Sequence, residues 1–219
     1  RACNRYRRRF LVTSTSEVYG ANPKASFTED DDAIIGPSRY RRWCYAAGKL
    51  LDEFHAYAYH YSTELPMTIV RLFNTVGPRQ VGHYGMVVPT FVGQALRGEP
   101  ITVYGDGSQK RCFTYVKDVV RCLYELAVGD NTVGEVYNVG SQQEVSIGDL
   151  AATVKSMTGS DAPIVYKSYS EVYGEDFVDM ERRVPDTDKL ASAIGYRPDT
   201  PLESILESII AWMREGKDH

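Results

Sequence analysis

Two short segments contain the residue types that are needed to take a proton from an alcohol. One is Ser14 to Gly20, which reads Ser-Thr-Ser-Glu-Val-Tyr-Gly, and the other places Tyr45 and Lys49 four residues apart. On a helix this spacing puts two side chains one turn apart on the same face. An ammonium group close to a phenol favours the phenolate, which can act as a general base. A hydroxyl group of Thr15 or Ser16 would hold the substrate oxygen while the proton leaves.

A Tyr and a Lys at this spacing occur on many helices by chance, so the pair alone does not indicate catalysis. The preceding segment adds information, because residues 10–13 read as an apolar strand that runs into the hydroxyl-rich turn. In a doubly wound sheet, the end of a strand and the helix that follows it meet at the same crevice. The order of strand, turn and helix therefore predicts that Thr15, Tyr45 and Lys49 lie together.

The composition is that of an ordinary globular chain. Its 219 residues, 43% hydrophobic and 25% charged, are enough for one large domain or two small ones. The net charge of −4 gives no electrostatic reason to expect nucleic acid as a partner, and no apolar stretch approaches the ~20 residues of a membrane span. Because the cysteines show neither a CxxC pattern nor a metal-ligand spacing, we predict no metal site and free thiols in a cytoplasmic protein, at Cys3, Cys44, Cys112 and Cys122.

Strand and helix patterns alternate along the chain, which is typical of an α/β fold. We expect a long helix that begins near Ser38 and turns one apolar stripe toward the core, made of Trp43, Ala47, Leu50, Phe54, Tyr57 and Tyr61. Ser146 is expected to cap another helix, with Asp149 in the capping-box position. Further strands are expected at 68–73, 101–104, 136–139 and 164–166, and further helices at 89–96, 117–128, 186–194 and 202–214.

A glycine-rich turn of the GxGxxG or GxxGxxG kind does not occur in the sequence. The short Gly105-Asp106-Gly107 segment lies in an expected turn and cannot replace it. These 219 residues therefore do not contain the usual cradle for the pyrophosphate of a dinucleotide.

With these motifs the sequence resembles the extended short-chain dehydrogenase/reductase family, and within it the NAD-dependent nucleotide-sugar epimerases, dehydratases and decarboxylases. The likeness covers essentially the whole chain, and its signatures are residues 13–20, the Tyr45/Lys49 pair, and residues 71–79, 101–118 and 182–186. It implies the C-terminal part of a Rossmann-like doubly wound parallel sheet plus a small α/β substrate-binding domain. Residues 1–80 would form the remaining part of the NAD-binding domain, and residues 81–219 mainly the substrate-binding domain, with some segments returning to the sheet.

The resemblance also implies which residues act on the sugar and hold the cofactor. Tyr45 is the base, Lys49 favours its phenolate and binds the nicotinamide ribose of NAD, and Thr15 holds the sugar hydroxyl. Ser16 and Glu17 follow it in the same catalytic turn. The remaining residues expected at the cofactor are Thr13, Ser14 and Phe73.

A second group of residues is implied in binding the UDP part of a UDP-sugar. Asn74, Arg111 and Arg183 match residues that hold the diphosphate, and Val88 lies in the stretch that contacts uracil. Forked donors suit this task, because Arg makes bidentate contacts to phosphate that Lys cannot make. Without the resemblance, each Arg would be interpreted as part of a surface ion pair, and the segment around Val88 as the core of a helix.

The reaction that follows oxidation of the sugar is left open by the sequence. The 4,6-dehydratases of the family have an Asp acid directly before the Glu of the Glu-Val-Tyr-Gly motif, whereas Ser16 holds that position here. Two reactions remain: C4 epimerisation through a transient 4-keto sugar, which the region from Glu29 to Pro78 favours by a small margin, and decarboxylation of UDP-glucuronate. The decarboxylases use a Glu at the position of Glu17 and an Arg at that of Arg183, and the segment from Tyr173 to Pro185 also resembles theirs.

An alternative of another class is a non-catalytic nucleotide-sugar-binding or dimerisation module, since the glycine-rich part of the family's fold is not in this sequence. Against it, Thr15, Tyr45 and Lys49 have no packing reason to occur together. The resemblance further implies a homodimer that pairs through the helix of Tyr45 and Lys49 and the helix before it.

Overall fold

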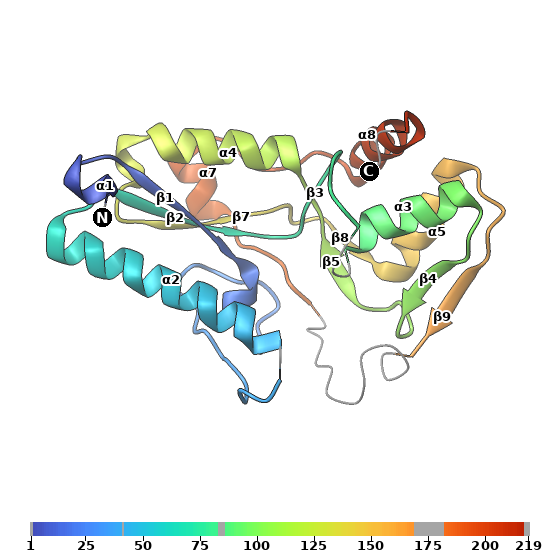
Figure 1. Cartoon of the computed structure of the whole chain (residues 1–219), viewed down its shortest axis with the longest axis horizontal. Helices are drawn as coiled ribbons and strands as arrows, with labels where there is room; N and C mark the ends of the chain where they lie inside the picture. The colour runs from blue at the N-terminus through green and yellow to red at the C-terminus, as the bar shows by residue number, and fades with distance from the viewer. Residues whose placement is uncertain (1, 41, 83–85, 169–181, 217–219) are drawn as a thin grey trace.

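A three-stranded parallel sheet forms the centre of one half of the molecule. The computed structural model describes residues 2–40, 42–82, 86–168 and 182–216, so the part of the Tyr173 segment before residue 182 lies outside them. The strand order is β1 (Phe10–Thr15), β2 (Met67–Leu72) and β7 (Val136–Val139). Helix α2 (Arg42–Thr63) covers one face of the sheet, and α4 (Val116–Val128) and α7 (Asp188–Ile194) cover the other (Figure 1).

The alternation of side chains along the strands explains why both faces are covered. Val12 and Ile69 point to the α2 face, whereas Leu11 and Val70 pack with α4 on the opposite face. Strand β2 is therefore buried along most of its length and apolar at four of its six positions, the exceptions being Thr68 and Arg71.

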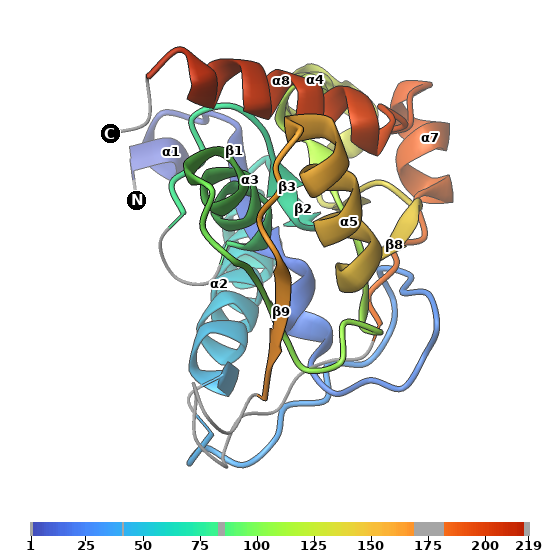
Figure 2. The ribbon, with the colours of Figure 1, turned by 90° about the vertical axis from the view of Figure 1, so that its right-hand side faces the viewer.

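The other half of the molecule is a small α/β unit (Figure 2). Helices α3 (Val87–Arg97), α5 (Ile147–Thr158) and α8 (Leu202–Arg214) share one apolar core with strand β4 (Ile101–Tyr104), which pairs in parallel with β9 (Ile164–Lys167). The short strands are β3 (Thr75–Val76) with β6 (Thr114–Tyr115), and β5 (Lys110–Cys112) with β8 (Glu144–Ser146). Within the described residues the remaining elements are α1 (Ala2–Arg5), η1 (Ser16–Tyr19) and η2 (Asp130–Thr132).

This arrangement confirms the predicted fold class. The predicted strands and helices are present with ends that differ by one or two residues, except that α2 begins at Arg42, four residues after the predicted start near Ser38. The Ser146 hydroxyl accepts a hydrogen bond from the Asp149 N–H at 3.0 Å, as a helix cap does. Strand β7 and helices α4 and α7 come from after residue 80 and belong to the sheet half. The boundary near residue 80 itself stays a prediction.

The predicted buried stripe of α2 is wrong for half of its members. Trp43 is buried, and Leu50 and Tyr57 are half-buried, but Ala47 is exposed and the exposed fractions of Phe54 and Tyr61 are 62% and 78%.

The inward positions of α2 are taken instead by two alanines and one carboxylate, at Ala46, Glu53 and Ala56. Small side chains allow the helix to lie close to the sheet. The carboxylate is accommodated because an arginine of β2 lies opposite it. A hydrophobicity pattern cannot predict that Glu53 points inward, since such a pattern assigns a charged residue to the surface.

All four cysteines are free thiols, as the sequence predicts. Burial raises the pKa of Cys112 and of Cys122 to about 12, so both thiols stay protonated near neutral pH. None of the helices in the described ranges is long and apolar enough to cross a bilayer.

Two glycines give a paired test of the packing. Gly48 lies inside α2 and an added Cβ meets nothing within 4 Å, whereas a Cβ on Gly140 would lie 2.7 Å from the Phe73 Cβ and 2.9 Å from the Pro185 Cγ. We expect Gly48→Ala to raise the free energy of unfolding by about 0.5–1 kcal/mol, because glycine is a poor helix former. Gly140→Ala should lower it by about 1–3 kcal/mol through overpacking. Urea unfolding measures both, and equal stability of the two variants would contradict this packing.

Candidate active site

The turn after β1 holds Glu17 in a fixed position. Thr15 ends the strand and caps η1, where its hydroxyl oxygen accepts a hydrogen bond from the Glu17 N–H at 3.3 Å. Gly20 closes the turn with a φ of +62°, and a Cβ there would lie 2.1 Å from the Ile34 carbonyl oxygen. Only glycine fits this position, so the Glu-Val-Tyr-Gly order is explained by the shape of the turn.

Glu17 lies between two guanidinium groups. Its carboxylate accepts a hydrogen bond from Arg42 Nη2 at 3.2 Å and forms a close ion pair with Arg183 Nη1 through its other oxygen. Arg183 Nη1 also lies 3.4 Å from the Ser16 hydroxyl oxygen, as a donor. These contacts join η1, the start of α2 and the segment before α7.

A cavity of about 620 Å³ opens beside this cluster. Five predicted site residues line it, together with Arg42: Glu17, Asn74, Val88, Arg111 and Arg183. Its volume lies in the range of ordinary ligand pockets. Arginines outnumber acidic groups among the described lining residues, so the cavity suits a ligand that carries several negative charges.

The segment that carries Arg183 is held by a strand-like pairing with Phe27. The Phe27 N–H donates to the Val184 carbonyl at 2.9 Å, and the Asp186 N–H donates to the Phe27 carbonyl at 2.7 Å. Arg183 is buried as a result, and this burial lowers its pKa, with Arg111 and Arg42 acting in the same direction and Glu17 opposing them. An arginine remains charged at neutral pH despite such a shift.

Asn74 reaches the cavity from a strained turn after β2. Its φ of +26° lies in the left-handed region, which Asn tolerates better than most residues. The side-chain amide donates to the Cys112 carbonyl at 2.9 Å, and the Asn74 carbonyl accepts from the Thr114 N–H at 3.1 Å. These bonds fix Asn74 against β5 and β6, next to Arg111.

Tyr45 and Lys49 lie on the first turns of α2. The Tyr45 side chain is 56% exposed and begins one turn after Arg42, while Lys49 Nζ donates to the Thr13 carbonyl of β1 at 3.0 Å and contacts Asp52 at 3.5 Å. Thr13 and Lys49 also line a second cavity of about 470 Å³ between β1 and α2. An ammonium donor beside a strand end is a suitable contact for the hydroxyls of a ribose, so this part of the structure fits one end of a dinucleotide.

Two of the residues expected at the cofactor are enclosed by protein. The buried Ser14 hydroxyl donates to Glu53, and the fully buried Phe73 ring lies 6.2 Å from the Tyr19 ring between centroids. Their contact with the cofactor stays a prediction, and in this structure both side chains contribute to the interior.

Arg42 is the site residue that sequence reasoning missed. The signal was present, because Arg42 stands three residues before Tyr45 on the expected helix and therefore one turn away on the same side. Its pairing with Glu17 depends on a turn 25 residues upstream and is visible only in the folded chain.

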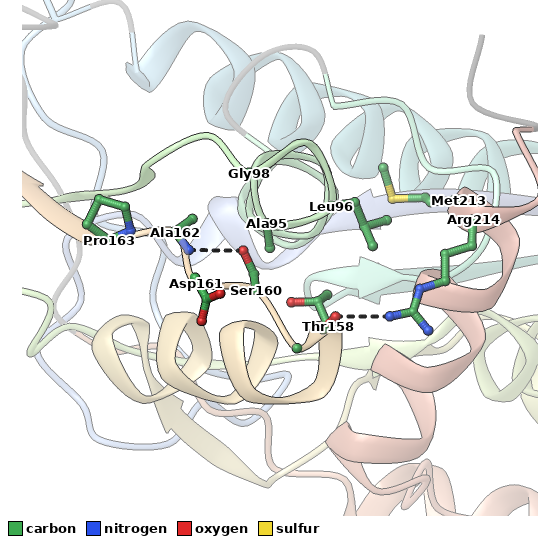
Figure 3. A pocket seen from close by; sticks show the side chains of 11 residues that line it. Ala95, Leu96, Gly98, Thr158, Ser160, Asp161, Ala162, Pro163, Met213 and Arg214 are labelled. Atoms are coloured by element: carbon green, nitrogen blue, oxygen red, sulfur yellow. Dashed lines mark hydrogen bonds between the residues drawn. The ribbon is translucent and has the colours of Figure 1, made fainter.

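Another cavity lies away from this cluster, at the C-terminal ends of α3, α5 and α8 (Figure 3). Two hydrogen bonds join residues around it: Arg214 donates to the Thr158 carbonyl at 3.0 Å, and the Ala162 N–H donates to the Ser160 hydroxyl oxygen at 3.2 Å. The described residues around it include none of the predicted site residues.

Comparison with known proteins gives the family. The sequence profile described as GDP-mannose 4,6 dehydratase matches residues 1–209. The chain belongs to this family. It is 40% identical over 210 residues to UDP-N-acetyl-alpha-D-glucosaminuronate decarboxylase of Bacillus cytotoxicus, which covers 95% of this chain and 64% of that protein.

Two solved structures share the fold over nearly the whole chain. The UDP-N-acetylglucosamine 4-epimerase from Methanobrevibacter ruminantium has a TM-score of 0.86 and 29% identity, covering 98% of this chain and 66% of that one. The UDP-glucuronic acid 4-epimerase from Bacillus cereus, solved in complex with NAD, has a TM-score of 0.82 and 28% identity, covering 98% and 64%. The chain thus spans less than two thirds of the length of these relatives.

The cavity arginines can be tested by ligand binding. Arg111→Ala and Arg183→Ala should each weaken binding of UDP by about tenfold to hundredfold, since hydrogen bonds to a charged group contribute roughly 1.5–3 kcal/mol. Isothermal titration calorimetry measures the affinity. Arg97→Ala is the matched control, because Arg97 forms an exposed ion pair with Glu99. Unchanged affinity for UDP in both cavity variants would contradict a role in holding the diphosphate.

Proposed function

We propose that this protein is an NAD-dependent enzyme that acts on a UDP-sugar by first oxidising the sugar at C4. The observation that carries the proposal is the cavity lined by Arg42, Arg111 and Arg183, where Glu17 pairs with Arg42 and Arg183 beside the helix of Tyr45 and Lys49. The UDP-sugar decarboxylase and 4-epimerases to which the chain is similar support this class of substrate.

Each of the predicted site residues has a separate role in binding the UDP-sugar or in oxidising it. Asn74, Arg111 and Arg183 hold the diphosphate, and the α3 segment with Val88 contacts the base. Thr15 orients the C4 hydroxyl. Tyr45 removes its proton, with the nearby ammonium of Lys49 stabilising the phenolate.

Lys49, Tyr45 and Thr13 would hold the nicotinamide ribose of NAD, which when bound supplies a hydride acceptor. The pyrophosphate of the dinucleotide needs donors beyond those of this sequence, because no glycine-rich turn is present in it.

We favour decarboxylation of a UDP-uronate as the step that follows oxidation. The 40% identical relative is a decarboxylase, and Glu17 with Arg183 forms the Glu and Arg combination that the resemblance assigns to decarboxylases. A ketone next to the carboxylate-bearing carbon makes loss of CO₂ easy, so positioning is the main requirement.

A C4 epimerase is the second candidate, and the sequence alone favours it by a small margin. The close fit to the two 4-epimerase structures supports it. Dehydration has less support, because Ser16 occupies the position of the acid and its buried hydroxyl lies beside Arg183.

Product analysis distinguishes these reactions. The intact natural protein is incubated with UDP-glucuronate and with UDP-glucose, and the products are followed by NMR. Release of CO₂ with a UDP-pentose supports the decarboxylase, and a C4 epimer supports the epimerase. Absence of any product, with UDP still bound, would favour the non-catalytic binding module.

Tyr45→Phe tests the base. We expect turnover to fall by about 10²–10⁴, the usual contribution of a general acid-base group, with UDP-sugar affinity nearly unchanged. Tyr124→Phe is the control, because Tyr124 is a comparably exposed tyrosine on α4, away from α2. Near-normal turnover of the Tyr45 variant would remove this residue from the mechanism.

We also propose that two copies of the protein pair through α2. The exposed residues Ala47, Leu51, Phe54, Ala58 and Tyr61 are spaced alternately by four and three, as in the seam of two packed helices. Such a run of exposed apolar side chains on one helix is typical of an interface.

Light scattering of Phe54→Glu tests this pairing. A buried, unpaired charge at the seam should convert a dimer into a monomer. Tyr124→Glu is the control, because Tyr124 is comparably exposed on α4, away from the proposed seam. A wild-type protein that is monomeric at micromolar concentration would contradict the proposal.

A further inference from the structure

A buried ion pair joins the helix of Tyr45 and Lys49 to the centre of the sheet. Arg71 of β2 binds Glu53 of α2 through two parallel bonds, Nε to Oε1 at 3.0 Å and Nη2 to Oε2 at 2.8 Å. The exposed fractions of the two residues are 8% and 3%. Ser14 of β1 donates a third bond to the same carboxylate. Two charges are thus satisfied in a fixed fork geometry inside the protein.

The same arginine also binds the turn and loop that follow β1. Arg71 Nη1 donates to the Tyr19 hydroxyl at 3.0 Å and to the Glu29 carbonyl at 2.8 Å. Burial raises the pKa of Tyr19 to about 12, although Arg71 acts in the opposite direction. Tyr19 therefore keeps its proton and donates it to the Asn138 side-chain oxygen of β7 at 2.7 Å.

This network continues to the backbone that carries Arg183. The Tyr19 ring stacks on Phe27, with centroids 4.6 Å apart and planes 9° from parallel. Asn138 holds the Phe27 carbonyl at 2.9 Å, and the Phe27 backbone pairs with Val184 next to Arg183. One chain of contacts thus runs from α2 to the segment that lines the cavity.

We propose that Arg71 is a positioning residue that fixes the Tyr45/Lys49 helix and the Arg183 segment relative to each other. The proposal rests on the proposed function for its turnover readout, but not for its binding readout. Glu53 stands one turn after Lys49 and two turns after Tyr45, so its bond to Arg71 sets how α2 lies against the end of β1. Tyr19 passes the same constraint, through Phe27, to the Arg183 segment that lines the cavity.

Stability alone does not explain the choice of these residues. A buried ion pair gains little over a well-packed apolar pair, because each charge must first leave water. The buried ion pair differs from an apolar pair in its directionality. The two parallel bonds between Arg71 and Glu53 allow one orientation of the helix on the sheet, whereas apolar contacts allow several. Catalysis is sensitive to such placement, since a shift of about 1 Å can cost on the order of a hundredfold in rate.

The central test is Arg71→Lys in the intact natural protein. Lysine keeps the charge and loses the fork and the contacts to Tyr19 and Glu29. We expect kcat to fall by about tenfold to hundredfold, UDP affinity to weaken severalfold, and the circular dichroism spectrum to remain that of the wild type. Glu135→Gln is the control, because Glu135 forms an exposed ion pair with Lys189 of α7. This control variant should change neither kcat nor UDP affinity.

Double variants separate positioning from a general loss of structure. In a Tyr45→Phe background, Arg71→Lys should reduce the residual turnover only slightly, because the group that it positions is already gone. Tyr19→Phe, which keeps the ring, should weaken UDP binding in the wild-type background and have little further effect in the Arg71→Lys background. The proposal would be overturned if the fold-loss of each double variant equalled the product of the losses of its two single variants. It would also be overturned by an Arg71→Lys enzyme with unchanged kcat and UDP affinity.

The two hypotheses fail in different ways. If the wild type turns over no UDP-sugar, the proposed function fails, whereas the coupling of Tyr19 and Arg71 is still read from UDP affinity. If Arg71→Lys does not fold, Ser14→Ala replaces it. This variant removes one bond to Glu53 and leaves the ion pair intact. A fall in kcat that disappears in the Tyr45→Phe background then supports positioning, and an unchanged kcat contradicts it.

Discussion

Arg71 and Glu53 meet inside the sheet half, where water cannot solvate either charge. Each group is therefore bound to the other, and the remaining guanidinium hydrogens must find oxygen acceptors nearby. Those acceptors come from η1 and from the loop after it, through Tyr19 and the Glu29 carbonyl. The requirement to satisfy one buried cation thus ties η1 and the loop after it to β2 and α2, in addition to the apolar contact that Leu50 of α2 makes with the cluster of Tyr19 and Phe27.

A second carboxylate, that of Glu17, is also paired with arginines, at the edge of the cavity. Glu17 is only partly buried, and its two arginine partners lie on the walls of the space that a ligand would fill. Arg71 is enclosed by protein, whereas Arg42 and Arg183 line a cavity. The protein therefore contains one ion pair enclosed between the sheet and α2 and one charged cluster that lines a cavity. A diphosphate would compete with Glu17 for the same donors.

Much of the fold could be predicted from the sequence, because local patterns determine it. The alternation of strands and helices follows from short apolar runs and their spacing, and the Ser146 cap follows from local hydrogen bonding. The stripe of α2 could not be predicted in this way. Its apolar residues repeat on two sides of the helix, so periodicity alone does not tell which side meets the sheet.

The sequence by itself determined the chemistry that is available: the Tyr45/Lys49 spacing, the hydroxyl-rich turn and the arginines near the motifs. Residue types and local spacing carry this information. The tertiary structure alone decided that Glu17 lies between Arg42 and Arg183, and that Glu53 turns inward to Arg71. These contacts join residues that are 18 to 166 positions apart. Their geometry depends on how the whole sheet is covered, which no local pattern records.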